Sequence, residues 1–171
     1  MQSNLFSSAF TRRLFRNKGA SFGLILIAGS LLLALFCYFI APDSSPNANR
    51  MIPEIGSKKP GFTALLLRIK RDKHINQAGF FNRLLNGTEE KYQYIPVTAY
   101  QFAGDSIVYQ KFVDEGVTER ASVLRLLAGD PAVISVTYHL GTDKFGRDIL
   151  SRLLIGVRVS LSVDLVAVLI L

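Results

Sequence analysis

Few side chains in this sequence of 171 residues are of the types and spacings that support catalysis or metal binding. The two histidines, His74 and His139, lie far apart and form no His-x-x-x-His pattern or carboxylate arrangement that binds a metal ion. The single cysteine, Cys37, allows neither a disulfide bond within the chain nor a metal site built from cysteines. The sequence also contains no G-x-x-x-x-G-K-S/T phosphate-binding loop and no nucleophile elbow. We therefore expect no enzymatic activity, no ATP binding, no cofactor and no metal.

Polar residues do gather in one stretch, which runs from His139 to Ser160. Gly141-Thr142-Asp143 is typical of a turn that leads into a helix, because a Thr or Asp side chain can accept hydrogen bonds from the unpaired amides of the first helical turn. We expect this helix to begin near Lys144. Apolar residues then recur every three or four positions and polar residues lie mostly opposite them, which predicts an amphipathic helix. The apolar positions are Ile149, Leu150, Leu153, Leu154, Val157 and Leu161, and the polar ones are Arg147, Asp148, Ser151 and Arg152.

The charged residues of this helix thin out towards its end. Asp148 and Arg152 are one helical turn apart with the acid first, which favours an exposed ion pair of about 0.3–0.5 kcal/mol. Beyond Val159 few residues are polar, and the last of them is Asp164. We therefore expect the amphipathic helix to continue into a membrane.

A second apolar segment lies near the N-terminus, from Gly19 to Ala41. It carries no charge and is long enough for the roughly 20 residues that cross about 30 Å of hydrocarbon. Residues 1–18 contain basic residues and no acidic one, which predicts a cytoplasmic N-terminus. Thr11-Arg12-Arg13 partly resembles a twin-arginine signal, but the apolar segment exceeds the usual 7–15 residues of a signal peptide and no A-x-A-like cleavage site follows. Lipid attachment at Cys37 is disfavoured because Phe36 stands where lipoprotein signals require a small residue.

The composition agrees with a membrane protein, since 49% of the residues are hydrophobic and the mean hydropathy is +0.28. A net charge of +7 would also suit nucleic-acid binding. However, the basic residues are spread out and accompany no zinc-ligand spacing, RNP-like aromatic motif or helix-turn-helix pattern. We expect lipid to be a partner and nucleic acid not to be one.

The residues between the two apolar segments, 42–138, have the composition of a soluble domain. Pro42 ends the first helix, because proline cannot continue the backbone hydrogen-bond ladder. Tyr92 to Tyr100 and Ser106 to Val113 are rich in aromatic and β-branched residues, and the turn at Gly104 between them predicts an antiparallel pair. The fold class expected for this region is therefore α+β. Three helices are predicted as well: Phe62–Lys70, Ala78–Leu85, and Glu119–Leu127, which Thr118 would cap and Gly129-Asp130-Pro131 would stop.

The polar stretch carries a resemblance to a known family. The pattern H-x-G-T-D-x-x-G-R-D-x-x-S-R-x-x-x-G-x-R-x-S-L resembles the permease subunits of peptide (dipeptide and oligopeptide) ABC importers. The chain also resembles them in its basic tail and first hydrophobic helix, and it departs from the family at Asp164, where a small residue, commonly Gly, is usual. The motif is carried by His139, Gly141, Thr142, Asp143, Gly146, Arg147, Asp148, Ser151, Arg152, Gly156, Arg158, Ser160 and Leu161.

This resemblance implies a membrane α-helical protein, the N-terminal part of the permease fold of an ABC importer, in the inner membrane of a bacterium. Two permease subunits would form the pathway, separate ATP-binding subunits would hydrolyse ATP, and a soluble extracytoplasmic peptide-binding protein would deliver the peptide. In the family the connection before the motif is generally shorter, so much of 42–138 is expected to be an insertion.

The resemblance also places the motif at the outer face, in a structural or gating role. We favour a structural role over direct peptide contact. Gly141, Gly146 and Gly156 would then serve a turn and close packing, while Arg147 and Arg152 reach lipid headgroups. A charge such as Asp164 at the centre of a membrane helix costs about 2.5–3.5 kcal/mol. Asp164 is therefore expected either to face the translocation pathway or to lie near the membrane surface.

The predicted organisation has five parts, and it leaves one alternative function open. The alternative is a membrane-anchored structural or interaction protein, in which Tyr92–Leu127 would form an extracytoplasmic binding module. The five parts are a cytoplasmic basic tail (1–18), transmembrane helix 1 (19–41), the extracytoplasmic α+β insertion (42–138), an interfacial turn and amphipathic helix (139–156), and the start of a truncated transmembrane helix 2 (157–171).

Overall fold

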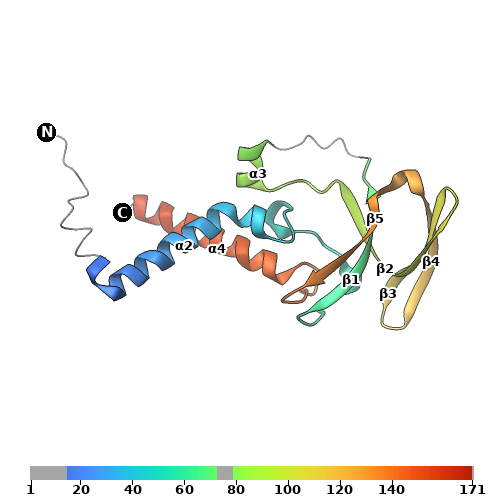
Figure 1. The fold of residues 1–171 in the computed structure, drawn as a ribbon, viewed down its shortest axis with the longest axis horizontal. Coiled ribbons are helices and arrows are strands. Elements are labelled where there is room, and N and C mark those ends of the chain that lie inside the picture. The colour runs from blue at the N-terminus through green and yellow to red at the C-terminus, as the bar shows by residue number, and fades with distance from the viewer. Residues whose placement is uncertain (1–14, 73–78, 171) are drawn as a thin grey trace.

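Two long apolar helices lie on the same side of a five-stranded antiparallel sheet in the computed structural model, which describes residues 15–72 and 79–170 (Figure 1). Helix α2 spans Lys18–Ile40, and its first amides are capped by the side chain of Asn17. Helix α4 spans Ile149–Ile170. Both are long and apolar enough to cross a membrane. Only 11% of the most apolar 18-residue stretch of α2, and 6% of that of α4, is buried. Core helices of soluble proteins are mostly buried, so these helices fit a membrane protein.

The two helices contact each other near the sheet. Cys37 and Tyr38 of α2 are buried together with Ile155 of α4, and Leu154 packs against them. Cys37 is fully buried, as expected of a thiol that serves packing. α2 ends at Ile40, and Pro42 follows its C-cap residue Ala41, as predicted.

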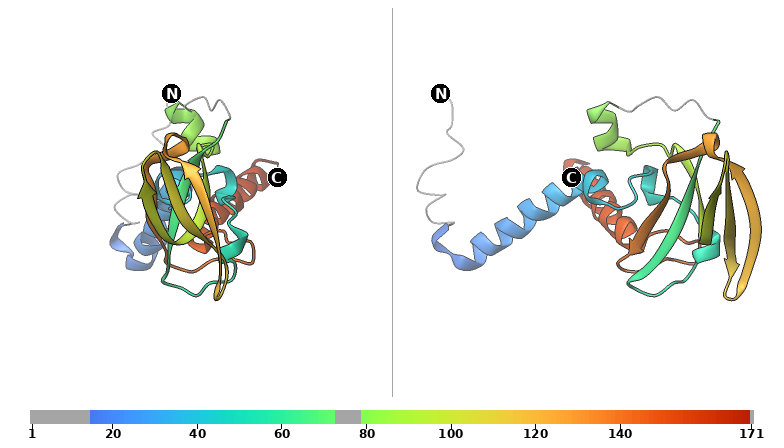
Figure 2. Two further views of the ribbon diagram at one scale, coloured as in Figure 1. Left: turned by 90° about the vertical axis from the view of Figure 1, so that its right-hand side faces the viewer. Right: turned by 45° about the vertical axis from the view of Figure 1, so that its right-hand side comes forward.

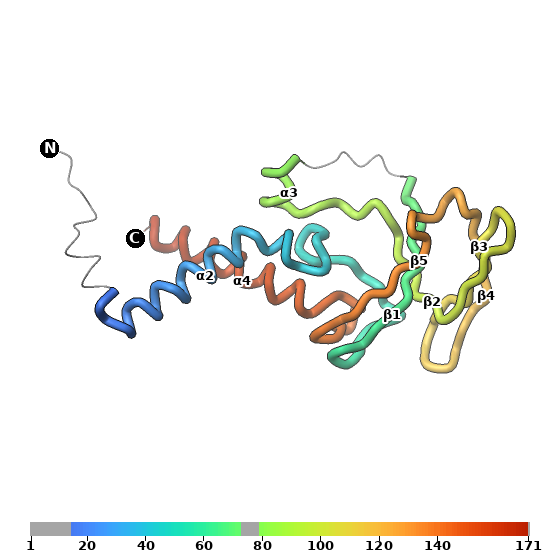
Figure 3. Tube along the Cα trace, viewed as in Figure 1, coloured from blue at the N-terminus to red at the C-terminus, as the bar shows by residue number. Residues whose placement is uncertain are grey.

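The sheet has the strand order β4-β3-β2-β1-β5. The residue where the chain enters the sheet lies beside the residue where it leaves. Phe62 at the start of β1 pairs with Tyr138 at the end of β5, and the amide of Gly61 donates to the carbonyl of Tyr138 at 2.9 Å. The chain therefore leaves and returns at one point, as the tube in Figure 3 shows, which is the geometry of an inserted domain. The strands are β1 (Phe62–Lys70), β2 (Tyr92–Ala103), β3 (Ser106–Asp114), β4 (Val117–Leu124) and β5 (Ala128–Tyr138).

Phe62–Lys70 is strand β1, so the helix predicted there is wrong. Leu66 and Leu67 point to opposite faces of β1, and both are fully buried. Leu66 packs with Ile52 and Ile55 on one face, whereas Leu67 packs with Ile107 on the other. A strand buried on both faces reads as a continuous apolar run, which periodicity alone does not distinguish from a helix.

The helix predicted over Glu119–Leu127 is also wrong, because this stretch forms strand β4 followed by the 3₁₀ turn η3 (Arg125–Leu127). Only Ala121 and Val123 show the alternation of a half-buried strand, and they pack into the core beside Ile107. The predicted stop at Gly129-Asp130-Pro131 lies inside β5 instead. Proline is tolerated there because β5 is an edge strand whose register shifts near Pro131.

Two other predictions for this region are confirmed. β2 and β3 pair antiparallel, and Ala103 faces Ser106 across a turn in which Gly104 has a φ of +58°. Helix α3 spans Phe80–Asn86, close to the predicted Ala78–Leu85, of which Ala78 lies outside the described residues. The observed domain is thus α+β, with more strand and less helix than expected.

Candidate functional site

The motif segment 139–152 lies against residues 42–58, and we call these two segments together the junction. The backbone amide of Thr142 donates to the carbonyl of Lys58 at 3.0 Å, and the amide of Lys58 donates back to the Thr142 hydroxyl at 2.9 Å. The same hydroxyl donates to the carbonyl of Ile55. The amide of Ser57 donates to the carbonyl of Asp143 at 2.8 Å. Two segments that the whole sheet separates in sequence are therefore joined as a pair.

Two motif glycines allow this close approach. Gly141 and Gly146 have φ of +77° and +72°, a region that L side chains rarely adopt. A Cβ atom on Gly141 would lie 2.2 Å from the carbonyl oxygen of Lys58, and one on Gly146 would lie 1.8 Å from that of Ile52. Apart from the neighbouring backbone of its own helix, no described atom lies within 4 Å of a Cβ built on Gly156. The turn and close packing expected of the glycines are thus seen at the first two positions.

The helix predicted to begin near Lys144 begins instead at Ile149. The side chain of Asp143 accepts hydrogen bonds from the amides of Phe145 at 2.9 Å and Arg147 at 3.0 Å, which closes a local turn. Gly146 then takes a positive φ, so a helix cannot continue through it. Asp143 caps a turn that precedes the helix.

Asp143 also binds the guanidinium group of Arg147, with the Nε donating to Oδ2 at 2.7 Å. Burial alone raises the pKa of Asp143, but the hydrogen bonds from Arg147 outweigh it and hold the pKa below its usual value. Arg147 also donates to Asn49 Oδ1 at 3.3 Å, whereas the Nε of Arg152 is 4.0 Å from Asp143. Arg147 is thus engaged inside the junction, and Arg152 lies at its margin.

The start of α4 is hydrogen-bonded to the segment that follows α2, through Asp148, Ser151 and Asp43. Asp148 Oδ2 accepts from both the amide and the hydroxyl of Ser151, and the Ser151 hydroxyl oxygen accepts from the amide of Asp43 at 2.9 Å. All three residues are buried. The exposed ion pair predicted between Asp148 and Arg152 is therefore wrong, because Asp148 turns inward and caps its own helix.

Asp43 is the centre of a second set of buried contacts. Its carboxylate accepts from the amides of Ser45 at 2.9 Å and Arg50 at 3.1 Å, and it lies 3.6 Å from the Arg50 guanidinium group. The Nε of Arg50 donates to Glu90 at 2.9 Å, and the guanidinium group stacks over the ring of Tyr94 at 4.4 Å. Burial lowers the pKa of Arg50, but the carboxylates of Glu90 and Asp43 outweigh it and raise the pKa. Arg50 therefore stays charged and links the junction to the sheet.

Tyr138 lines a small cavity of about 10 Å³ together with the buried carboxylates of Asp43 and Asp148. Arg50 lines it as well. Burial raises the pKa of Tyr138 to about 12; Arg50 lowers this pKa, while Asp148 and Asp43 raise it. The phenol therefore remains protonated near neutral pH and does not repel the two carboxylates.

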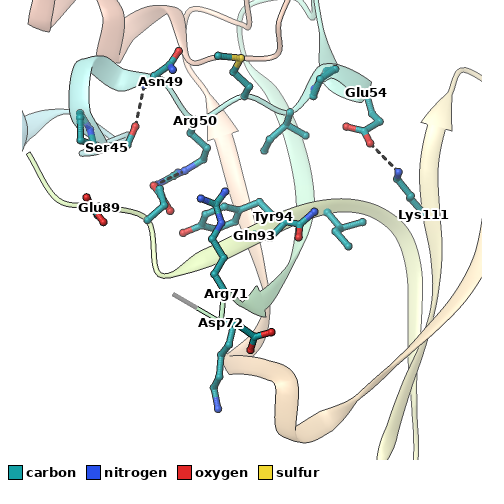
Figure 4. A pocket seen from close by; sticks show the side chains of 17 residues that line it. Ser45, Asn49, Arg50, Glu54, Arg71, Asp72, Glu89, Gln93, Tyr94 and Lys111 are labelled. Atoms are coloured by element: carbon teal, nitrogen blue, oxygen red, sulfur yellow. Dashed lines mark hydrogen bonds and ion pairs between the residues drawn. The ribbon is translucent and has the colours of Figure 1, made fainter. Parts of the chain in front are cut away.

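A larger open cavity of about 910 Å³ lies beside the junction, between residues 45–54 and strand β2 (Figure 4). Lys111 and Glu54 form an ion pair at 2.9 Å at one end, and Arg50 lies nearer the other. Arg50 forms an ion pair with Glu90, which also lines the cavity. Basic and acidic side chains are present in equal number. The lining therefore has no net formal charge, whereas the whole chain has a net charge of +7. The charged lining residues are Arg50, Lys70, Arg71, Lys111, Glu54, Asp72, Glu89 and Glu90.

The remaining motif residues lie away from this contact network. His139 is exposed at the end of β5, and His74 lies outside the described residues. Arg158 donates to the carbonyl of Leu84 in α3 at 2.7 Å and stacks over the ring of Tyr38. Asp164 is exposed on α4. Within residues 15–72 and 79–170, no three His, Cys, Asp or Glu residues are grouped to hold a metal ion.

Sequence reasoning missed the residues that the motif contacts. Asp43, Arg50 and Glu90 belong to no periodic pattern or motif in the sequence. Asp43 and Ser151 are 108 residues apart, so only the folded chain brings them together.

Comparison with known proteins concerns the other half of the junction. Residues 6–58 match the family described as the N-terminal TM domain of oligopeptide transport permease C. No curated protein and no solved structure shows significant similarity to the chain. The matched residues contain α2 and the segment 42–58, to which the motif segment is bound. The relationship to the permease subunits of peptide ABC transporters, predicted from the motif, is therefore confirmed for the N-terminal portion of the chain.

Proposed function

We propose that the chain is part of a permease subunit of an ABC transporter that imports peptides. The observation that carries this proposal is the junction. A segment that matches the permease family by residues 6–58 is joined by hydrogen bonds to a segment that carries the permease motif. Two independent signs of one family therefore meet in one structural unit.

The role that we propose is mechanical. Separate ATP-binding subunits would hydrolyse ATP and shift two permease subunits between inward-facing and outward-facing states, each stabilised by different contacts. Because Asp43 and Ser151 bind the end of α2 to the start of α4, these two helices would move together at this end. The motif residues would thus brace the pathway and not contact the peptide.

The proposed topology places the N-terminus in the cytoplasm of a bacterium and the inserted domain outside the inner membrane. It is supported by the basic residues before α2, since positive residues remain on the cytoplasmic side. Helices α2 and α4 would then cross in opposite directions, and the junction would lie at the outer face. At that face an extracytoplasmic peptide-binding protein would deliver the peptide to the permease.

Within this arrangement we place Asp164 on the translocation pathway. It is an exposed carboxylate on a helix that is otherwise apolar beyond Ser162, and charges in membrane helices usually face a cavity or a partner.

Peptide uptake in a bacterial strain that lacks the gene, complemented with the natural gene or with Asp164→Gly, tests both proposals. The natural gene is expected to restore uptake of a labelled peptide, and its product is expected to copurify with an ATP-binding subunit and a second permease subunit. Asp164→Gly is expected to change the uptake rate while leaving copurification intact. If the natural product copurifies with no ATP-binding subunit and restores no uptake, the permease function is wrong. If the variant transports as the natural protein does, Asp164 does not face the pathway.

A second candidate function is that of a membrane-anchored interaction protein, with the inserted domain as its binding module. The observation in its favour is the cavity of about 910 Å³, which β2 lines with Tyr94 and Gln93. It differs from the first proposal in that purification would yield a soluble ligand or protein and no ATP-binding subunit.

A further inference from the structure

Helix α3 has an apolar face that the described part of the chain leaves largely exposed. Phe80, Phe81 and Leu85 are 59%, 76% and 58% exposed. At 100° per residue these side chains fall on one side of the helix, together with Leu84. Asn82 and Asn86 fall on the other side, where the side-chain Nδ2 of Asn86 donates to Asn82 Oδ1 at 2.6 Å. A helix of only seven residues is therefore sharply amphipathic.

Contacts with both long helices fix the position of α3. The ring of Phe80 lies 5.6 Å from that of Phe39, one residue before the end of α2. Arg158 of α4 donates to the carbonyl of Leu84 at 2.7 Å. Figures 1 and 2 show α3 beside the end of α2 that is nearer the sheet. The apolar face of α3 is thus continuous with the apolar surface of α2, where Phe36 and Ile40 are exposed.

The level of α3 along α4 also marks the end of the polar contacts of the junction. Arg158 is roughly two and a half turns, about 14 Å, along α4 from its start at Ile149. The polar contacts of the junction are made before this level, on the side of the sheet. Arg158 stacks on Tyr38, and Arg83 stacks on Phe39 with its guanidinium carbon 4.6 Å from the ring centre. Aromatic rings with arginines beside them are typical of the boundary between headgroups and acyl chains.

We propose that α3 is a membrane-interface anchor, whose Phe80, Phe81 and Leu85 insert among the acyl chains of the outer leaflet beside α2. The inference rests on the proposed function in two respects, namely that α2 crosses a membrane and that its end near the sheet lies at the outer face. Lipid is the occupant that the observations favour, because the exposed face continues the surface of a membrane helix and has arginines at its edge. The anchor would hold the inserted domain at a fixed height above the bilayer.

The chain contains no tryptophan, so a single substitution creates a unique fluorescent reporter. Three single variants are reconstituted in phosphatidylethanolamine and phosphatidylglycerol vesicles, with or without brominated acyl chains. Phe81→Trp reports on α3. Phe102→Trp is the matched control, an exposed aromatic residue on the sheet, and Leu32→Trp is the reference inside α2. Each replaces an exposed apolar side chain, so the fold should be retained.

Brominated lipid is expected to quench Phe81→Trp several-fold more than Phe102→Trp, whereas aqueous acrylamide should do the reverse. If Leu32→Trp is quenched by brominated lipid but Phe81→Trp only by acrylamide, the anchor is wrong while the membrane helix stands. If neither quencher reaches Phe81→Trp, a protein surface covers α3 and the lipid proposal is again wrong. If Leu32→Trp is not quenched by brominated lipid, α2 does not cross the membrane, and the proposed function fails first.

Discussion

Gly146→Ala is expected to keep the junction from closing and to lower the free energy of unfolding by about 2–5 kcal/mol. The substitution adds a Cβ atom 1.8 Å from the carbonyl oxygen of Ile52, and that oxygen belongs to a backbone that cannot rotate away like a side chain. It also forces a non-glycine residue to a φ of +72°. Thermal unfolding of the purified protein in detergent, followed by circular dichroism, measures the loss.

Gly116→Ala separates these two causes. Gly116 has a φ of +80°, but apart from its two chain neighbours no residue in the described part of the chain has an atom within 4 Å of a Cβ built there. This control should therefore show only the backbone strain, about 1–2 kcal/mol. Equal destabilisation by the two variants would contradict the close approach of the motif to Ile52.

Asp43→Ala is expected to destabilise the protein by about 3 kcal/mol, because it removes the buried carboxylate of a largely buried ion pair. The amides of Ser45 and Arg50 would lose their acceptor, and the half-buried Arg50 side chain would keep only Glu90 as a neighbouring carboxylate. Buried groups without partners are costly because water cannot replace the lost hydrogen bond.

Glu115→Ala is the matched control for this variant. Glu115 also pairs with a basic residue, Lys58, at 3.0 Å, but its side chain is 85% exposed. Exposed ion pairs contribute about 0–1 kcal/mol, so a shift in the unfolding midpoint much smaller than that of Asp43→Ala is expected. Similar shifts in the two variants would mean that Asp43 does not hold the junction together.

Much of the outline was predictable from local sequence. The two long helices follow from apolar length alone, and the β2–β3 hairpin follows from β-branched residues around Gly104. By contrast, β1 resembles a helix in sequence because both of its faces are buried, which removes the alternation of a strand. In β4 the alternation of apolar and polar residues is too short to predict a strand, because only Ala121 and Val123 reach the core.

Only the motif segment of the junction was predictable from the sequence. The spacing of Gly141, Asp143 and Gly146 indicated a turn, and the motif indicated a family. Their contacts, however, are backbone carbonyls and amides of Ile52, Ile55 and Lys58, and any residue type supplies those groups. Long-range pairing through the backbone leaves no pattern in a single sequence, so the second half of the junction required the structure.

The most direct test of the central claim, that the sheet lies outside a pair of membrane-crossing helices, is the labelling of single cysteines with a membrane-impermeant maleimide. Glu115→Cys places a thiol at the exposed turn between β3 and β4, and Ser7→Cys places one in the basic tail. The buried Cys37 makes the unsubstituted chain the unlabelled control. Glu115→Cys is expected to react in intact spheroplasts and Ser7→Cys only in inverted membrane vesicles. Reaction of Glu115→Cys in inverted vesicles alone would contradict the claim.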